Sequence, residues 1–251
     1  MPMYLSEAIT LRRRRTRDAD ALVTLWCRSF GRVVASTRSV LKSSSRYAGV
    51  TQPFNRLQAI FYAKTDEQEI WTLTQASLIE SYNGIHNNLE RISYASNLIE
   101  WIDALSGDFQ SSERVWRILT ECLSRWDRSA PQEEELFYYQ LHLLVDAGQQ
   151  PDVGACQSCG KTQDGLWYYI SSAGGIFCPS CRTEGLSLSG GSVEILRRLL
   201  ESSHPPSIRM SDQQKQEIRS LLQTHGFYHA GLRSRTAQFQ EQMNQKNSPD
   251  R

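Results

Sequence analysis

Apolar residues in the first third of the chain occur in short runs whose pattern favours β-strands. The runs are rich in Val, Ile, Thr and aromatic residues, and several alternate with polar positions. Turn-forming residues such as Gly49 and Gln52-Pro53 separate them. Residues 4–80 therefore predict about five short strands. An oligonucleotide-binding (OB) barrel fits this length, and the pattern does not distinguish it from an SH3-like barrel. The runs lie at 21–27, 32–37, 57–63 and 69–80.

From residue 84 onward the apolar residues recur with the period of helices. Two amphipathic faces follow each other, and the first is ended by Gly107. The first face comprises Leu89, Ile92, Ser96, Ile99, Ile102 and Leu105, and the second comprises Val115, Ile118, Leu119, Cys122, Leu123 and Trp126.

Three further helices are predicted from their end signals. The first begins after Pro131, where glutamates at 133–135 suit the positive end of a helix dipole, and it stops at Gly148. We expect Ser192 to cap the next helix and Ser211 to cap the last, which stops at Gly226.

The segment 150–190 interrupts the helices with glycines and two C-x-x-C pairs. The pairs are Cys156 with Cys159 and Cys178 with Cys181, separated by a spacer long enough for a short hairpin. This spacing is typical of zinc sites, because four thiolates fit a tetrahedral Zn²⁺ ion. We therefore predict a structural zinc, while an iron–sulfur cluster or a dithiol redox pair is less well supported. Four protein ligands leave no open position for catalysis at zinc.

Basic residues concentrate at the start of the chain. The net charge of the whole chain is +1, yet residues 1–64 hold 12 Lys/Arg against 3 Asp/Glu. Such asymmetry indicates an anionic partner, although a solvated basic face with no ligand is the plain alternative. Side chains alternate along a strand, so Arg12 and Arg14 should face one side and Arg13 and Arg15 the other. The candidate phosphate contacts are Arg12, Arg14, Arg32, Arg38, Lys42 and Arg46.

No arrangement of residues in the sequence supports catalysis. Nucleophile-elbow, P-loop and H-E-x-x-H motifs are missing from the sequence, and its histidines are scattered. The aromatic run at 167–169 between the cysteine pairs could stack on bases, but packing around the metal hairpin is the favoured interpretation. The start of the chain carries no signal-peptide pattern and no apolar run long enough to cross a membrane, so we expect a cytoplasmic, non-membrane protein.

The order of these blocks resembles the bacterial recombination mediator family RecO. The basic run at 12–15 is denser than is usual in that family, and 36–40 is less basic. The stretches that carry the resemblance are RDADALVTLWCRSFGRVVAS (17–36), KSSSRYAG to QPF (42–54), WTLTQASLIESY (71–82), LERISYASNLIEWIDAL (89–105), YYQLHLLVDAGQQPDVGACQSCGK (138–161) and GGIFCPSC (174–181).

The resemblance implies an α+β protein in which an N-terminal OB-fold β-barrel precedes an α-helical domain with an inserted Cys₄ zinc finger. We expect the barrel at 1–80, the helical domain at 81–149 and 186–237, the zinc finger at 150–185 and a disordered tail at 238–251. The resemblance also implies binding to single- and double-stranded DNA and annealing of complementary strands. It further implies that the protein works with RecR, and often RecF, in recombinational repair after DNA damage. Together they would load RecA onto DNA coated by single-stranded-DNA-binding protein (SSB). No catalytic residue is implied.

Two other function classes remain open on the residues alone. A zinc-containing protein-interaction scaffold would use the hairpin to dock a partner and would have no DNA activity of its own. A zinc-containing nucleic-acid enzyme would show metal-dependent cleavage of DNA.

Overall fold

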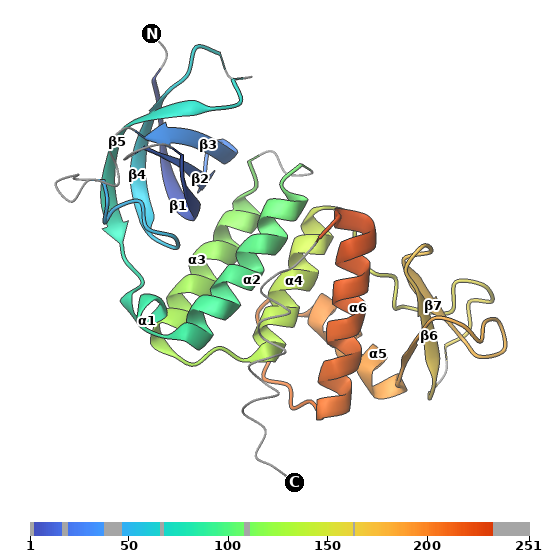
Figure 1. Ribbon diagram of the computed structural model, residues 1–251. Coiled ribbons are helices and arrows are strands. Elements are labelled where there is room, and N and C mark those ends of the chain that lie inside the picture. The colour runs from blue at the N-terminus through green and yellow to red at the C-terminus, as the bar shows by residue number, and fades with distance from the viewer. Residues whose placement is uncertain are drawn as a thin grey trace. The chain divides into compact units, whose positions relative to one another are not determined.

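The computed structural model describes residues 3–16, 20–37, 47–65, 68–107, 111–162 and 164–232 (Figure 1). The chain packs as two compact units. The first consists of Met1–Ala95 with Ser106–Ser129, and the second consists of Ser96–Leu105 with Ala130–Arg251. Within the described ranges, no helix combines the length and the apolar character that a membrane crossing needs.

The first unit contains a closed five-stranded barrel with the strand order β1-β2-β3-β5-β4. Strands β3 and β5 pair in parallel, and the other neighbours pair antiparallel. This connectivity is that of an OB barrel and confirms the predicted fold class. The strands are β1 (Met3–Arg15), β2 (Ala21–Cys27), β3 (Gly31–Thr37), β4 (Arg56–Tyr62) and β5 (Trp71–Glu80).

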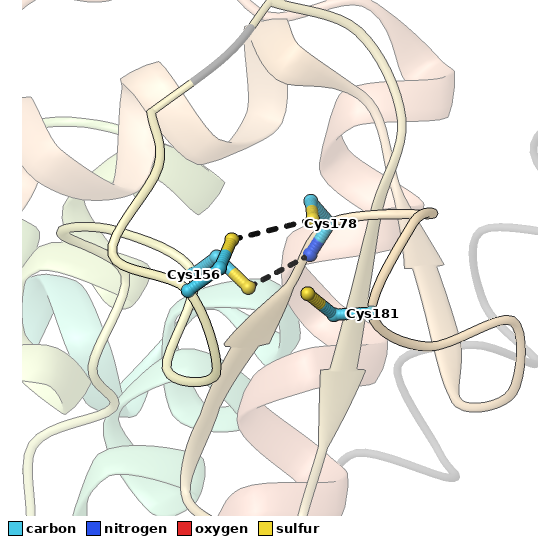
Figure 2. Close-up of side chains that lie close together, drawn as sticks. Cys156, Cys178 and Cys181 are labelled. Carbon is cyan, nitrogen blue, oxygen red and sulfur yellow. Dashed lines mark hydrogen bonds between the residues drawn. The ribbon is translucent and has the colours of Figure 1, made fainter.

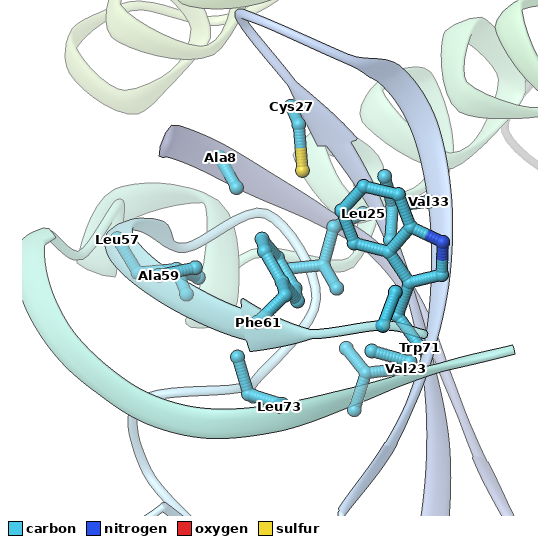
Figure 3. Packing of buried hydrophobic residues seen from close by; sticks show 12 residues of the cluster. Ala8, Val23, Leu25, Cys27, Val33, Leu57, Ala59, Phe61, Trp71 and Leu73 are labelled. Atoms are coloured by element: carbon cyan, nitrogen blue, oxygen red, sulfur yellow. The ribbon is translucent and has the colours of Figure 1, made fainter. Parts of the chain in front are cut away.

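Inward-facing side chains of all five strands fill the barrel (Figure 3). They recur at every second residue, as in Val23, Leu25 and Cys27 of β2, because successive side chains of a strand point to opposite faces. Phe61 and Trp71 are the bulkiest members of this cluster, and their rings meet edge to face. In the residues that the structure describes, the barrel therefore has a packed core.

A hydrogen-bonded turn over residues 47–55 packs against the barrel through Val50. The Arg13 guanidinium donates to the Ala48 carbonyl at 2.6 Å, and the Tyr47 hydroxyl donates to the Thr74 carbonyl at 2.8 Å. The Asn55 amide donates to the Gly49 carbonyl at 2.9 Å. Phe54 adopts a left-handed backbone with φ of 73°, which its surroundings must hold in place.

Two helices, α1 (Asn83–His86) and α3 (Glu113–Arg128), complete the first unit together with the first turns of α2 (Leu89–Leu105). The sequence pattern missed α1, which is one turn long and depends on a tertiary contact. The Asp127 carboxylate accepts the backbone N–H groups of Gly84 at 2.6 Å and Ile85 at 3.3 Å. A Cβ atom at position 84 would lie 2.0 Å from the Asp127 carbonyl, so only glycine fits there.

Helix α3 packs against the barrel through its first turns. Arg28 forms a bidentate ion pair with Glu113, with the shorter contact at 2.7 Å. The guanidinium groups of Arg28 and Arg56 both lie within 6.0 Å of the centre of the Trp116 ring. These contacts hold α3 and the barrel in one compact unit.

The second unit is built around α4 (Glu133–Asp146), which is buried over most of its length. Helix α6 (Asp212–Ala230) lies beside it and contributes the ion pair of Arg219 with Glu133 at 2.6 Å. Helix α5 (Gly190–Glu201) meets α4 where His142 Nε2 lies 3.1 Å from the Leu199 carbonyl. His142 is therefore a hydrogen-bonded core residue.

Two predicted helix ends are wrong. Helix α5 is capped by Ser189, whose hydroxyl accepts the Ser192 N–H, so the capping hydroxyl lies three residues earlier than expected. Helix α6 continues past Gly226 to Ala230, and Gly231 caps it with a left-handed φ of 62°. Gly226 serves packing, because a Cβ atom there would lie 2.8 Å from the Trp101 ring.

A small three-stranded sheet with the order β7-β6-β8 stands between α4 and α5 in the chain (Figure 1). Its strands are β6 (Trp167–Ile170), β7 (Gly175–Phe177) and β8 (Leu186–Leu188). All the neighbours pair antiparallel, and β6 and β7 form a hairpin. This sheet positions the cysteine pairs.

Candidate metal centre and nucleic-acid surface

The β6–β7 hairpin brings all four paired cysteines together. Cys156 and Cys159 precede β6, whereas Cys178 and Cys181 follow directly after β7. The backbone N–H of Gln157 donates to the Ile176 carbonyl at 3.0 Å and ties the first pair to β7. The four sulfur atoms lie within 4.8 Å of one another. Figure 2 shows Cys156, Cys178 and Cys181 of this cluster close together.

Each C-x-x-C pair forms a tight turn of similar design. In the first, Gly160 N–H donates to the Cys156 carbonyl at 2.8 Å, and φ of Gly160 is 70°. Glycine is required there because the left-handed backbone is strained for other residues. In the second, the N–H groups of Cys181 and Arg182 donate to the Cys178 carbonyl at 2.9 and 3.0 Å.

The sulfur spacing fits a tetrahedral metal ion. Zn–S bonds of about 2.3 Å at tetrahedral angles place two sulfurs about 3.8 Å apart. The Sγ atoms of Cys159 and Cys178 are 3.8 Å apart. The Cys178 N–H also points to Cys156 Sγ at 3.3 Å, a hydrogen bond that stabilises a thiolate.

The thiols of the cluster differ in acidity because each has different neighbours. Burial would raise the pKa of Cys156, but hydrogen bonds from the backbone N–H groups of Cys178, Cys159 and Ser158 lower it to about 6. Hydrogen bonds with the sulfurs of Cys178 and Cys159 raise the pKa of Cys181 to about 12. A bound cation would remove this difference, since thiolates are the metal-binding form.

Aromatic residues of the hairpin pack inward and connect it to α6. Trp167 and Tyr169 are 0% and 1% exposed, which favours packing over base stacking for both rings. The Tyr169 hydroxyl bonds to His225 Nδ1, and His225 Nε2 bonds to the Gln149 carbonyl. His229 Nε2 donates to the Ser171 carbonyl at 2.9 Å.

Three of the six predicted DNA contacts lie together on the outside of the barrel. Arg12 pairs with Thr24 and Arg14 with Leu22 across β1 and β2, whereas the intervening Arg13 pairs with the core residue Val23. Paired residues of antiparallel strands share a face, so Arg12 and Arg14 point outward. The same reasoning places Arg32, the partner of Trp26, on this face. We call Arg12, Arg14 and Arg32, with Leu22, Thr24, Val34 and Ser36, the basic strand face.

A β-bulge decides which arginines of β1 face outward. Before it, Ala8 and Thr10 pair with core residues of β2, so even-numbered positions face inward. The register shifts between Thr10 and Arg12, after which odd-numbered positions such as Arg13 face inward. The predicted split of the arginine run between two faces agrees with this register.

Other basic residues of the N-terminal segment are held in structural contacts. Arg13 binds the turn over residues 47–55 through the Ala48 carbonyl, and Arg28 pairs with Glu113. Arg56 pairs with Glu7 at 2.6 Å. The predicted contacts Arg38, Lys42 and Arg46 lie outside the described residues.

Arg32 experiences a positive environment on the basic strand face. Partial burial lowers its pKa first, and the nearby charge of Arg12 lowers it further. Two neighbouring guanidinium groups repel each other, and an anion between them would relieve this repulsion.

A second basic feature, which the sequence reasoning missed, lies along α3. Arg117, Arg125 and Arg128 line an open hollow of about 700 Å³ together with hydroxyl side chains and Glu121. Their spacing of eight and three residues places them on one helical face, so the period could have revealed them.

Comparisons with known proteins cover nearly the whole chain. The family model described as "Recombination protein O N terminal" matches residues 1–82, and "Recombination protein O C terminal" matches residues 86–237. The "DNA repair protein RecO" of Symbiobacterium thermophilum is 31% identical over 90% of this chain and 91% of its own length. The protein of that name from Pelotomaculum thermopropionicum is 28% identical over 91% of this chain and 90% of its own length. The one from Bacillus pumilus is 26% identical over 95% of this chain and 93% of its own length. The chain therefore belongs to the RecO family of DNA repair proteins.

Proposed function

We propose that this protein is a non-enzymatic mediator of recombinational repair that binds single- and double-stranded DNA and anneals complementary strands. The observation that carries the proposal is the basic strand face, where Arg12, Arg14 and Arg32 share the outside of an OB barrel. Membership of the RecO family supports a role in DNA repair. Such a protein works in the bacterial cytoplasm, at the nucleoid.

Electrostatic capture of phosphates is the mechanism that these residues suit. Guanidinium groups bind phosphate oxygens through paired N–H donors, and such contacts hold the DNA without reading its sequence. Neutralising the backbone also reduces the repulsion between two strands, which is the main electrostatic barrier to annealing. The protein then needs no catalytic group.

The same proposal includes partners that the chain would meet at a repair site. They are RecR, RecF, RecA and SSB, with RecA loaded onto DNA that SSB had coated. What supports them is membership of the RecO family.

We also propose that the four cysteines bind one structural zinc ion. Cys156, Cys159, Cys178 and Cys181 would supply four thiolates, and the ion would cross-link the two turns at the base of the hairpin. All four ligand positions would be filled by protein, so the role of the ion is to stabilise the hairpin.

A strand-annealing assay on complementary oligonucleotides coated with SSB tests the function. Wild-type protein should accelerate duplex formation, RecR should change the rate, and affinity should fall steeply with salt. Absence of both DNA binding and annealing at low salt would favour a zinc-containing protein-interaction scaffold. Metal-dependent cleavage of the oligonucleotides would favour a nuclease.

A further inference from the structure

The basic strand face combines cationic, hydroxyl and aliphatic side chains. Arg12, Arg14 and Arg32 are exposed, and the paired positions between them are partly buried. Trp26 lies on the same side of β2 and is 0% exposed, so its ring is unavailable to a ligand. The remaining members of the face are Leu22, Thr24, Val34 and Ser36.

Tyr4 and Phe30, two aromatic residues of the barrel that are partly buried, pack against Trp71 in its core cluster. Tyr4 lies 4.7 Å from Trp71 between ring centres, and Phe30 lies 5.5 Å from the same ring. A protein that binds a single strand by its bases stacks them on exposed aromatic rings. None of the described residues of the basic strand face supplies such a ring.

The arrangement of the arginines suits a line of phosphates. Arg12 and Arg14 are two residues apart on one strand, so their Cα atoms are about 7 Å apart, and Arg32 extends the row across β2 to β3. That interval is close to the distance between neighbouring phosphates of an extended single strand. The mutual repulsion of Arg12 and Arg32 further favours a bound anion.

We propose that the basic strand face holds single-stranded DNA by its phosphates and sugars, with the bases directed away from the barrel. The inference rests on the proposed DNA binding and specifies which part of the DNA the protein contacts. The Thr24 hydroxyl of the face can donate to a phosphate oxygen, as the arginines do, whereas the Ser36 hydroxyl donates to the Trp71 carbonyl at 3.2 Å.

This orientation has a direct consequence for annealing. When bases stack on a protein, each must be released before it pairs, at a cost of about 1–3 kcal/mol per base. A strand held only by its backbone keeps the pairing edges of its bases in solvent. A second strand can then pair with it while the first remains bound.

The test compares full-length protein binding to two labelled oligonucleotides of about 20 units. One is oligothymidylate, and the other is an abasic deoxyribose-phosphate chain of the same length and charge. We expect dissociation constants that agree within about threefold at one salt concentration. Abasic DNA that binds more than about tenfold weaker than oligothymidylate would overturn the inference and leave the proposed function intact.

A second measurement locates the contact. The variant with Arg12→Ala, Arg14→Ala and Arg32→Ala should bind both oligonucleotides more weakly, by the same factor. The slope of log affinity against log salt concentration should become shallower by roughly 2. The charge-matched control carries Arg182→Ala, Arg198→Ala and Arg209→Ala, which are exposed residues of the second unit, and should bind as wild type does. Equal loss in both variants, or none in the first, would overturn the assignment to this face.

Permanganate oxidation of thymine reports the orientation of the bases. Thymines bound to the protein should stay as reactive as in free oligothymidylate, because their faces remain in solvent. Protection of the bound thymines would contradict the inference. Failure of the wild-type protein to bind either oligonucleotide would overturn the proposed function and the inference together.

Discussion

At the scale of single residues, His225 occupies a buried position between three elements of the second unit. It is 2% exposed, and both ring nitrogens have partners, Tyr169 and the Gln149 carbonyl. A carbonyl only accepts, so Nε2 carries the proton and Nδ1 accepts from the Tyr169 hydroxyl in the neutral ring. A second proton would break this pattern, and burial lowers the pKa of His225 to about 4 although the hydrogen bond to Gln149 partly opposes the shift.

The depressed pKa predicts a loss of stability in mild acid. The unfolded chain binds this proton below pH 6.5 and the folded one only near pH 4, so the contribution is complete above pH 6.5 and is lost as pH falls towards 4. The loss is at most about 3 kcal/mol. Urea unfolding of wild type and His225→Gln from pH 7.5 to 5 measures this loss of stability, because only the wild-type protein has the titrating His225 side chain. Parallel curves for the two proteins would contradict the prediction.

At the scale of elements, the ends of α5 and α6 show how helix signals compete. Ser189 and Ser192 both suit a cap, and Ser189 is the one whose N–H and hydroxyl reach the Glu217 carboxylate of α6. Ser189 and Glu217 are 28 positions apart in the chain, so the local sequence around the helix start could not predict this contact. Gly226 and Gly231 likewise both suit a helix end, and the close approach of Trp101 explains why Gly226 lies inside the helix.

Replacing Gly226 by alanine tests its packing role through the sign of the change in protein stability. Alanine inside a helix is more favourable than glycine by about 1 kcal/mol. If Gly226 neither ended the helix nor packed closely against a neighbour, its replacement by alanine would therefore stabilise the protein. The contact with Trp101 instead predicts destabilisation of about 1–3 kcal/mol. Thermal unfolding of Gly226→Ala measures the sign, with Gly107→Ala as the control, since no atom lies within 4 Å of its added Cβ. An unchanged or raised melting temperature would refute the packing role.

At the scale of the whole molecule, the two compact units separate the two candidate sites. The basic strand face belongs to the first unit, and the four cysteines belong to the second. Helix α3 packs with the barrel through Arg28, Arg56 and Trp116, so the first unit is larger than the barrel alone. Damage to one site should therefore leave the other largely functional.

Cys156→Ser tests this separation. Loss of one thiolate should release the proposed zinc and destabilise the second unit by several kcal/mol, because metal binding and hairpin folding are coupled. DNA affinity should stay within about twofold of wild type. Zinc content, thermal unfolding and oligonucleotide binding measure the three effects, with Ser180→Ala as a control at an exposed position of the second cysteine turn. Complete loss of DNA binding in a folded Cys156→Ser protein would contradict the separation.

The sequence by itself determined the features that depend on local pattern. Short apolar runs predicted the strands β2, β3, β4 and β5, the 3.6-residue period predicted α2 and α3, and end signals predicted α4. The paired C-x-x-C motifs predicted the cysteine cluster. Each of these follows from side-chain direction within a few residues, which the backbone geometry fixes.

Only the tertiary structure decided the features that depend on register and on distant partners. Alternation alone divided the arginines at 12–15 between two faces, but the bulge before Arg12 and the pairing with β2 decided which face points outward. The carboxylates of Glu113 and Glu7 decided that Arg28 and Arg56 serve the fold. Charge is thus readable from composition, whereas its availability to a ligand depends on which partners folding brings within a few ångströms.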